Sequence, residues 1–236
     1  MLIIANWKMN PLDIKNALRL LNFYKKLKYK DLWVAPPYVY LPILIKRFKN
    51  FTFGAQNIHY EKSGAYTGEI SAYMIKKIGC KFVIINHSER RKMGETLEIA
   101  NLKIKQALKN NLISVVCFGE QKKIDDLKKL KNIWNREFNI LFKDIKNFKK
   151  IILAYEPSWA ISTQKIGPVP KEIVEFFLEW IKNKINSQIK ILYGGSVFPE
   201  NIENYLDLNI NGFLIGSQSL KPKNFKIIIN KIKNVV

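Results

Sequence analysis

The strongest constraint on the fold is an alternation of short apolar segments with longer amphipathic segments along the whole chain. Eight runs have the β-branched and aromatic composition of buried strands, and helix-period stretches follow them. The predicted strands are Leu2–Ala5, Leu32–Ala35, Phe51–Ala55, Phe82–Asn86, Ser114–Phe118, Ile151–Tyr155, Ile189–Tyr193 and Phe213–Ile215. The predicted helices are Asp13–Lys28, Val39–Phe48, Ile70–Ile78, Leu97–Lys109, Lys122–Ile145, Lys171–Ile185, Pro199–Tyr205 and Lys223–Lys233. This α/β pattern predicts a (β/α)8 barrel; a doubly wound open sheet is also compatible, because the pattern does not reveal strand order.

The sequence contains no recognisable domain boundary. Its 236 residues contain no Gly- or Ser-rich linker, no low-complexity run and no solenoid-period repeat, so we expect one domain over residues 1–236. The segment Met1–Lys8 is too short in apolar length for a signal peptide, and no run approaches the ~18 apolar residues of a membrane span. We therefore expect a cytoplasmic protein without a membrane partner.

The formal net charge of +21 raises the question of a nucleic-acid partner. The lysines are spread over nearly every predicted helix, however, and no nucleic-acid-binding motif is present, so we expect no such partner. A positive field of this kind steers small anionic substrates inward. The two cysteines, Cys80 and Cys117, lie far apart in apolar runs without metal-ligand spacing, which predicts buried free thiols and no metal site.

Polar and ionisable residues follow many of the predicted strands. They are Asn6 and Lys8 after the first, Gln56 and Asn57 after the third, His87 and Glu89 after the fourth, Glu120 after the fifth and Glu156 after the sixth. The strands of a barrel all end on one face, where active sites lie, so these side chains are expected to meet there. Any one of them is also explained as an ordinary solvated residue at a strand end; the combination is harder to explain that way.

The segment 151–165 begins with a predicted buried strand, which Glu156 follows directly. Pro157 ends the strand because it has no N–H group, and Trp159 is the one large apolar anchor in the polar stretch that follows. The pattern predicts a base fixed at a strand end beside a movable lid, which is what proton abstraction from a carbon acid requires.

Glycine-containing turns follow the last two predicted strands, at Gly194-Gly195-Ser196 and at Gly216-Ser217. Barrel enzymes bind phosphate at these two positions through backbone N–H groups, which glycine allows to approach closely. A single Gly-Gly pair is more often only a tight turn. Two such turns, together with Lys8, favour a small phosphorylated substrate.

These motifs together resemble the triosephosphate isomerase family, and the likeness runs from Asn6 to Leu220. The matching pieces are Asn6–Asn10, Gly54–Asn57, Tyr66–Glu69, His87–Arg91, Cys117–Glu120, Ala154–Pro157 with Trp159–Ala160, Tyr193–Val197, and Asn211–Gly212 leading to Gly216. The resemblance implies a single TIM barrel. It also implies cofactor-free interconversion of dihydroxyacetone phosphate and glyceraldehyde 3-phosphate, in glycolysis and gluconeogenesis.

The resemblance implies a catalytic role for five residues. Glu156 matches the base that moves a proton between two carbons, and His87 matches the electrophile that polarises the carbonyl. The family is a standard worked example of a neutral imidazole held at a helix N-terminus. Asn6 and Lys8 match the residues that hold the substrate oxygen and stabilise the enediolate, and Glu89 matches a supporting carboxylate.

The resemblance also implies how the phosphate is held and enclosed. The matching phosphate-binding residues are Ser162, Gly195, Ser196, Gly216 and Ser217. Residues 157–165 match a lid that excludes water and so protects the intermediate from losing phosphate. Trp159 is expected to anchor this lid, and Glu120, Arg90 and Arg91 are expected to form an ion-pair framework.

The loop 56–70 is too long and too polar for an idle connection in a compact barrel. In the family that the chain resembles, this loop projects into a second subunit, where Thr67 touches the neighbour's catalytic cluster. Tyr66 and Gln56 are expected at the same interface. A homodimer is therefore the expected assembly.

The chain departs from the family pattern at four positions that usually hold glycine: Asn86, Ser162, Gln164 and Ser217. Asparagine tolerates the left-handed region, so Asn86 is expected to keep its turn. Ser217 still donates its backbone N–H if its φ is negative, whereas a positive φ costs about 1–2 kcal/mol. Ser162 and Gln164 are expected to alter lid closure more than chemistry.

Two other functions fit part of the pattern. An aldolase-like or other sugar-phosphate barrel enzyme is the first, but an aldolase needs a Schiff-base lysine inside the barrel and Lys8 lies near its rim. A basic scaffold without catalysis is the second. Such a scaffold has no need of Lys8, His87 and Glu156 together.

Overall fold

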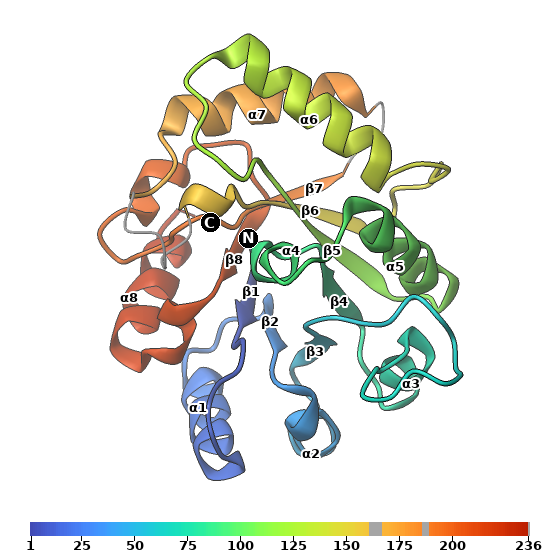
Figure 1. Cartoon of the computed structure of the whole chain (residues 1–236). Helices are drawn as coiled ribbons and strands as arrows, with labels where there is room; N and C mark the ends of the chain where they lie inside the picture. The colour runs from blue at the N-terminus through green and yellow to red at the C-terminus, as the bar shows by residue number, and fades with distance from the viewer. Residues whose placement is uncertain (161–166, 186–188, 236) are drawn as a thin grey trace.

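The computed structural model describes residues 1–160, 167–185 and 189–235. Its strands form a closed parallel barrel in sequential order, with the helices outside it (Figure 1). The strands are β1 (Leu2–Asn6), β2 (Leu32–Ala35), β3 (Thr52–Ala55), β4 (Phe82–Ile85), β5 (Ile113–Phe118), β6 (Ile151–Tyr155), β7 (Lys190–Tyr193) and β8 (Gly212–Ile215). The α-helices are α1 (Ile14–Lys26), α2 (Leu41–Arg47), α3 (Ala72–Lys77), α4 (Ser88–Lys92), α5 (Leu97–Lys109), α6 (Leu127–Leu141), α7 (Lys171–Lys184) and α8 (Pro222–Lys233). The 3-10 helices are η1 (Tyr38–Tyr40), η2 (Ser158–Ala160), η3 (Ile202–Tyr205) and η4 (Ser217–Leu220).

The predicted (β/α)8 barrel is confirmed, and the open sheet is excluded because β8 pairs with β1. Gly212 makes this closure possible. Its φ is +152°, and a Cβ there would lie 1.7 Å from the carbonyl oxygen of Leu2. Each predicted strand ends within about one residue of the observed one, because buried parallel strands are continuous apolar runs bounded by polar residues.

The predicted helices differ from the observed ones in three places. The predicted helix Lys122–Ile145 is too long, since α6 covers only Leu127–Leu141 and begins where Asp126 caps it through its side chain. The segment predicted as the helix Pro199–Tyr205 forms only the 3-10 turn η3. Helix α4 was not predicted, because five residues are too few to display an apolar period.

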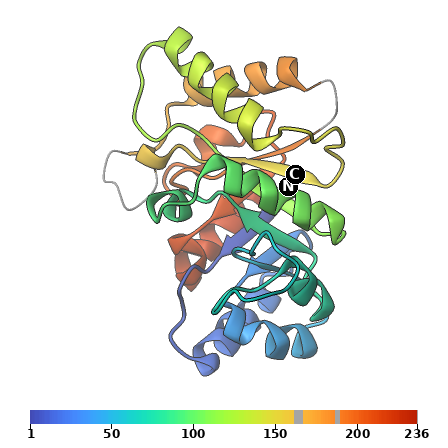
Figure 2. The same cartoon turned by 45° about the vertical axis from the view of Figure 1, so that its right-hand side comes forward.

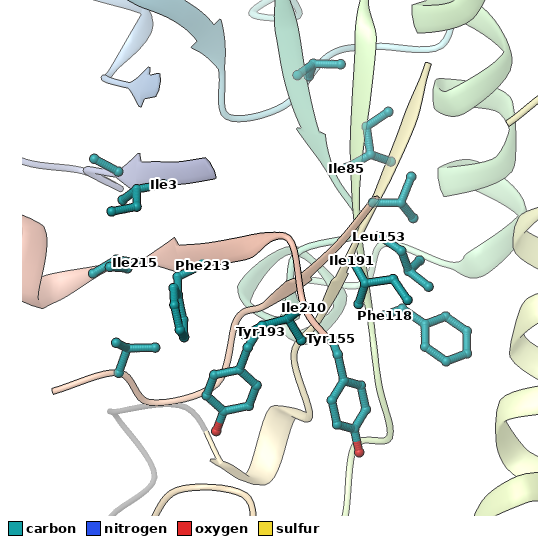
Figure 3. Packing of buried hydrophobic residues seen from close by; sticks show 14 of the residues in the cluster. Ile3, Ile85, Phe118, Leu153, Tyr155, Ile191, Tyr193, Ile210, Phe213 and Ile215 are labelled. Atoms are coloured by element: carbon teal, nitrogen blue, oxygen red, sulfur yellow. The ribbon is translucent and has the colours of Figure 1, made fainter. Parts of the chain in front are cut away.

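Alternating strand residues face the barrel interior and the surrounding helices. In β6, Ile152 and Ala154 belong to a smaller apolar cluster made of strand residues. Leu153 and Tyr155 belong to the larger cluster, which also contains helix residues (Figure 3). Outside the barrel, α6 and α7 lie side by side in Figures 1 and 2, and the rings of Trp134 and Trp180 pack 5.3 Å apart between them. This aromatic layer fixes the outer wall behind β5 and β6.

Two large rings fill one end of the barrel interior. Trp33 of β2 and Phe82 of β4 pack with ring centroids 5.2 Å apart. Gly54, on the strand between them, leaves the space for this pair, since a Cβ there would lie 2.5 Å from the Phe82 ring. The barrel is therefore a packed core, and a ligand has access only at its ends.

Both cysteines, Cys80 and Cys117, are buried and free, as predicted. Burial raises the pKa of the Cys80 thiol to about 12, so it is an inert packing group at neutral pH. Within the described ranges, no helix is both long enough and apolar enough to cross a membrane.

Candidate active site

One pocket opens at the carboxyl ends of the strands and contains about 400 Å³ of free space, part of it open to solvent. Its lining comes from both ends of the chain: Asn6, Lys8, His87, Glu156, Gly194, Gly195, Ser196, Val197, Leu214, Gly216, Ser217 and Gln218. Four of the five residues predicted for catalysis and the two predicted glycine turns therefore meet in one site, whereas Glu89 does not line the pocket and contacts it through Lys8. Sequence reasoning did not single out Val197, Leu214 or Gln218.

The base and the electrophile predicted from the sequence are in contact. Glu156 follows β6 directly and is only 3% exposed. His87 is the N-cap of α4, and its Nδ1 accepts the backbone N–H of Glu89 at 3.2 Å. An imidazole that accepts at Nδ1 carries its proton on Nε2 when it is neutral. That Nε2 lies 3.0 Å from Oε1 of Glu156.

The carboxylate of Glu156 is stabilised in its ionised form despite burial. Burial alone raises its pKa, but the charge and hydrogen bond of His87, the charge of Lys8 and the backbone N–H of Ser88 together bring the pKa below its ordinary value. The N–H of Ser88 lies 3.3 Å from Oε2. The base is therefore ionised at neutral pH and held in place through both of its oxygens.

Lys8 adopts a backbone conformation unusual for its residue type, with φ at +54°. Its N–H donates to Oδ1 of Asn6 at 3.1 Å, and its carbonyl accepts from the Gln56 amide at 2.8 Å. Its ammonium group binds Oε1 of Glu89 at 2.6 Å. A left-handed lysine costs on the order of 1–2 kcal/mol, and such strain clusters at functional sites.

Asn86, which precedes the histidine, has a φ of +61°. This confirms the expected left-handed turn, which asparagine tolerates. Its side-chain amide donates to the Cys117 carbonyl at 2.8 Å and so ties the end of β4 to β5. The substitution of the family's glycine therefore preserves the backbone that presents His87.

The opposite wall of the pocket includes the two glycine-containing turns after β7 and β8. Gly195 has no room for a side chain, because a Cβ there would lie 2.4 Å from the hydroxyl of Tyr193. Gly216 is less constrained, because a Cβ there would lie 3.2 Å from Cε of the flexible Lys8 side chain. Ser217 begins η4 without a positive φ, so the conformational cost considered for it does not arise. The predicted residue Ser162 lies outside the described residues, as does Gln164.

Comparisons with known proteins agree with this geometry. A model of the triosephosphate isomerase family matches residues 1–232. The chain is 40% identical to the triosephosphate isomerase of Mycoplasma capricolum over 240 residues, covering 97% of each chain. It is 39% identical to that of Mycoplasma mobile over 239 residues, covering 95% of this chain and 96% of the relative. It is 37% identical to that of Clostridium botulinum strain Loch Maree over 244 residues, covering 97% and 98%.

The chain belongs to the triosephosphate isomerase family. It is an intramolecular isomerase with the activity of that family, and the resemblance stated from its motifs is thus confirmed.

Glu120 differs from its predicted place in an ion-pair framework. Its carboxylate, buried at 2% exposure, accepts the indole N–H groups of Trp134 at 3.0 Å and Trp159 at 2.8 Å. Trp159 is thus held at the start of the predicted lid. The two arginines do face carboxylates, Arg90 at Glu95 and Arg91 at Glu137.

The loop 56–70, which was predicted to meet a second subunit, is exposed at its tip. Tyr66 is 42% exposed, and Thr67 is also exposed. Gln56 is engaged within its own chain instead, because its side-chain amide donates to the carbonyls of Lys8 and Ala35, both at 2.8 Å. None of the three lines the pocket of its own chain.

Sequence reasoning missed Ser88 as a contributor to the site. Its N–H reaches Glu156 because the first amides of a helix have no partner within the helix. The signal was available, since a residue just after a helix-capping histidine carries such a free amide. Recognising it required knowing that α4 starts at Ser88.

Proposed function

We propose that the chain interconverts dihydroxyacetone phosphate and D-glyceraldehyde 3-phosphate through an enediolate, with Glu156 as the base and His87 as the electrophile. The observation that carries this proposal is the 3.0 Å approach of His87 Nε2 to Glu156 Oε1 in a pocket that also contains Lys8. A base and a proton donor side by side suit a reaction in which one proton moves between carbons and another between oxygens.

Glu156 takes a proton from the carbon beside the carbonyl and returns it to the neighbouring carbon. Its carboxylate is ionised at neutral pH, for the reasons given above, so it is ready to accept that proton. The two electrons of the broken C–H bond move into the enediolate. Because the carboxylate is also confined on two sides, little reorganisation is needed at the moment of transfer.

His87 and Lys8 stabilise the oxygens on which negative charge develops. The Nε2–H of His87 donates to the carbonyl oxygen, and the ammonium group of Lys8 supplies a positive charge. Asn6 lines the same part of the pocket, and its Oδ1 orients Lys8 by accepting the backbone N–H of that lysine. Glu89 supports the lysine, at 2.6 Å from its Nζ. The mechanism needs no cofactor.

The phosphate group of the substrate binds at the wall made by Gly195, Ser196, Gly216 and Ser217. Glycine at two of these positions lets the backbone N–H groups approach an anion closely. Ser162 is part of the same proposal through the family resemblance alone.

We also propose a homodimer of single-domain subunits in the cytoplasm. The support is the exposure of large apolar side chains in the loops that follow β1, β2 and β3, at Met9, Val39 and Tyr66. These three strands are neighbours in the barrel, so the loops lie along one side of its mouth. In this dimer Thr67 completes the partner's site, a role that rests on the family resemblance alone.

A coupled assay in both directions tests the proposal. Turnover of dihydroxyacetone phosphate and of glyceraldehyde 3-phosphate by the purified chain is expected, with an equilibrium constant independent of enzyme concentration. Absence of turnover in both directions, by a folded protein, would refute it. Light scattering at micromolar concentration tests the dimer separately, and a fully active monomer would exclude it.

A further inference from the structure

The catalytic base of the proposed function is connected to α4 at two separate points. The first is the hydrogen bond from the Ser88 N–H to the Glu156 carboxylate at 3.3 Å. The second lies one helical turn later, where the guanidinium group of Arg91 donates a hydrogen bond to the Ser158 hydroxyl, two residues after Glu156. The same short helix is capped by His87. Its position therefore governs both the electrophile and the base.

Arg91 binds the ends of two neighbouring strands through one guanidinium group. Its Nη1 donates to the Gly119 carbonyl after β5 at 2.8 Å, and its Nη2 donates to the Ser158 hydroxyl after β6 at 3.0 Å. Its side chain is 4% exposed. A buried, planar fork with two fixed acceptors holds a definite geometry, which a lysine at the same place cannot do.

The backbone around Glu156 is held closely to the segment after β5. The N–H of Glu156 donates to the backbone carbonyl of Phe118 at 2.7 Å, and the N–H of Ser158 donates to the backbone carbonyl of Glu120 at 2.8 Å. Between them Pro157 donates nothing, and a Cβ at Gly119 would lie 2.7 Å from its nitrogen. The Ser158 hydroxyl therefore gives this turn a second side-chain link to α4, besides the Glu156 carboxylate itself.

We propose that Arg91 and Ser158 are positioning residues for the catalytic base. The guanidinium group of Arg91 is anchored on the Gly119 carbonyl and holds the Ser158 hydroxyl. It thereby fixes the turn that carries Glu156 against α4, the helix that His87 caps. The inference rests on the proposed function, because it matters to catalysis only if Glu156 is the base. It assigns a role to Ser158 that the family match does not supply, and it changes the role expected of Arg91 from an ion-pair framework to the alignment of two catalytic groups.

The ion pair alone does not explain this arrangement. The Glu137 carboxylate approaches the guanidinium group no closer than 3.9 Å at Nη1, whereas the contacts to Gly119 and Ser158 are hydrogen bonds. An arginine retained only to neutralise Glu137 has no need to bind a serine beside the catalytic residue.

The test compares three serine variants in the coupled assay. Ser158→Ala removes the hydroxyl and is expected to lower kcat about fivefold while KM stays within twofold, because a misaligned base affects the transition state more than binding. Ser158→Thr keeps the hydroxyl and is expected to restore most of kcat. Ser114→Ala is the matched control, since its hydroxyl is also buried but has no hydrogen-bond partner; it should leave kcat unchanged.

Two further measurements identify the affected step. With substrate deuterated at the carbon that loses its proton, the isotope effect on kcat should be larger for Ser158→Ala than for the wild type. The reason is that proton abstraction limits the rate more fully in the variant. Arg91→Lys should lower kcat as well, and adding Ser158→Ala to it should have little further effect. If Arg91→Lys does not fold, the serine variants still decide the question.

The outcomes separate this inference from the proposed function. An unchanged kcat in Ser158→Ala, or an equal loss in Ser158→Thr, overturns the inference, because the hydroxyl then plays no part. Glu156→Asp is assayed in parallel. Full turnover by that variant would refute the proposed function itself, whereas a large loss there with no loss in Ser158→Ala refutes the inference alone.

Discussion

The two walls of the pocket are built in different ways. On the wall formed by β1, β4 and β6, ionisable side chains contact one another directly: Lys8 binds Glu89, and His87 meets Glu156. On the wall formed by β7 and β8, two glycine-containing turns contribute to the lining, and the constraint at Gly195 is steric. The difference teaches that the reaction wall depends on the identity of its side chains, whereas the phosphate wall depends on space and backbone direction. Substitutions should therefore affect kcat on the first wall and KM on the second.

The largest effect is expected for Lys8→Met. The change removes the positive charge that faces the developing enediolate and leaves Glu89 without its partner. We expect kcat/KM to fall by about 10³-fold or more, since one electrostatic contact to a transition state is worth 10²–10³ and a full charge is worth more. The coupled assay measures this loss, and circular dichroism checks the fold. Retained activity in a folded variant would remove Lys8 from its role.

Glu156→Asp should have the next largest effect. The carboxylate is withdrawn by about one methylene from the carbon acid and from the Nε2 of His87, which it now approaches to 3.0 Å. We expect kcat to fall by about 10²-fold to 10³-fold with little change in KM, and the free energy of unfolding to change by about 1 kcal/mol or less. Steady-state kinetics and urea unfolding measure the two quantities. Wild-type turnover would mean that the base lies elsewhere.

Gly195→Ala tests the phosphate wall. The new Cβ would lie 2.4 Å from the Tyr193 hydroxyl, so the turn or the ring must move. We expect KM to rise about tenfold and kcat to fall less, because binding of the dianion is lost in ground state and transition state alike. Inhibition by inorganic phosphate should weaken in parallel. A loss confined to kcat would contradict the division between the two walls.

A similar asymmetry separates what could and could not be predicted from the sequence. The barrel was predictable because each buried strand is a continuous apolar run, as in Ile151–Tyr155. Catalytic candidates such as Glu156 were predictable because strand ends converge. The contacts that orient them were not, since Ser88 and Arg91 act from a five-residue helix without a detectable period. Glu120 was assigned to an ion-pair framework, although its partners are two indoles distant in sequence.

The charged framework behind the reaction wall should also make stability depend on pH. Burial and the like charge of Glu120 raise the pKa of Glu137 to about 7, although the positive charges of Arg91 and Arg136 partly oppose them. A carboxyl group with a raised pKa in the folded state binds its proton more tightly there than in the unfolded chain. Its contribution to stability is therefore present at low pH and is lost as the pH rises from about 4.5 through 7.

Glu137→Gln should remove this dependence. Between pH 5 and pH 8, the free energy of unfolding of the wild type is expected to fall by about 2–3 kcal/mol more than that of the variant. Urea unfolding at a series of pH values measures the difference. Parallel pH profiles for the two proteins would show that Glu137 does not titrate in this range.

Ser217→Gly should have the smallest effect, and it makes the comparison between the walls sharper. Ser217 stands where the family usually has glycine, and its backbone lies outside the positive-φ region, so glycine relieves no strain there. We propose that the phosphate binds the backbone N–H at this position, which glycine retains. Removing the side chain should therefore leave kcat and KM within about twofold of the wild type, as for surface substitutions that break no specific contact. Steady-state kinetics with both substrates measures this. A large rise in KM would show that the serine hydroxyl itself binds the phosphate, in which case this wall, too, depends on the identity of a side chain.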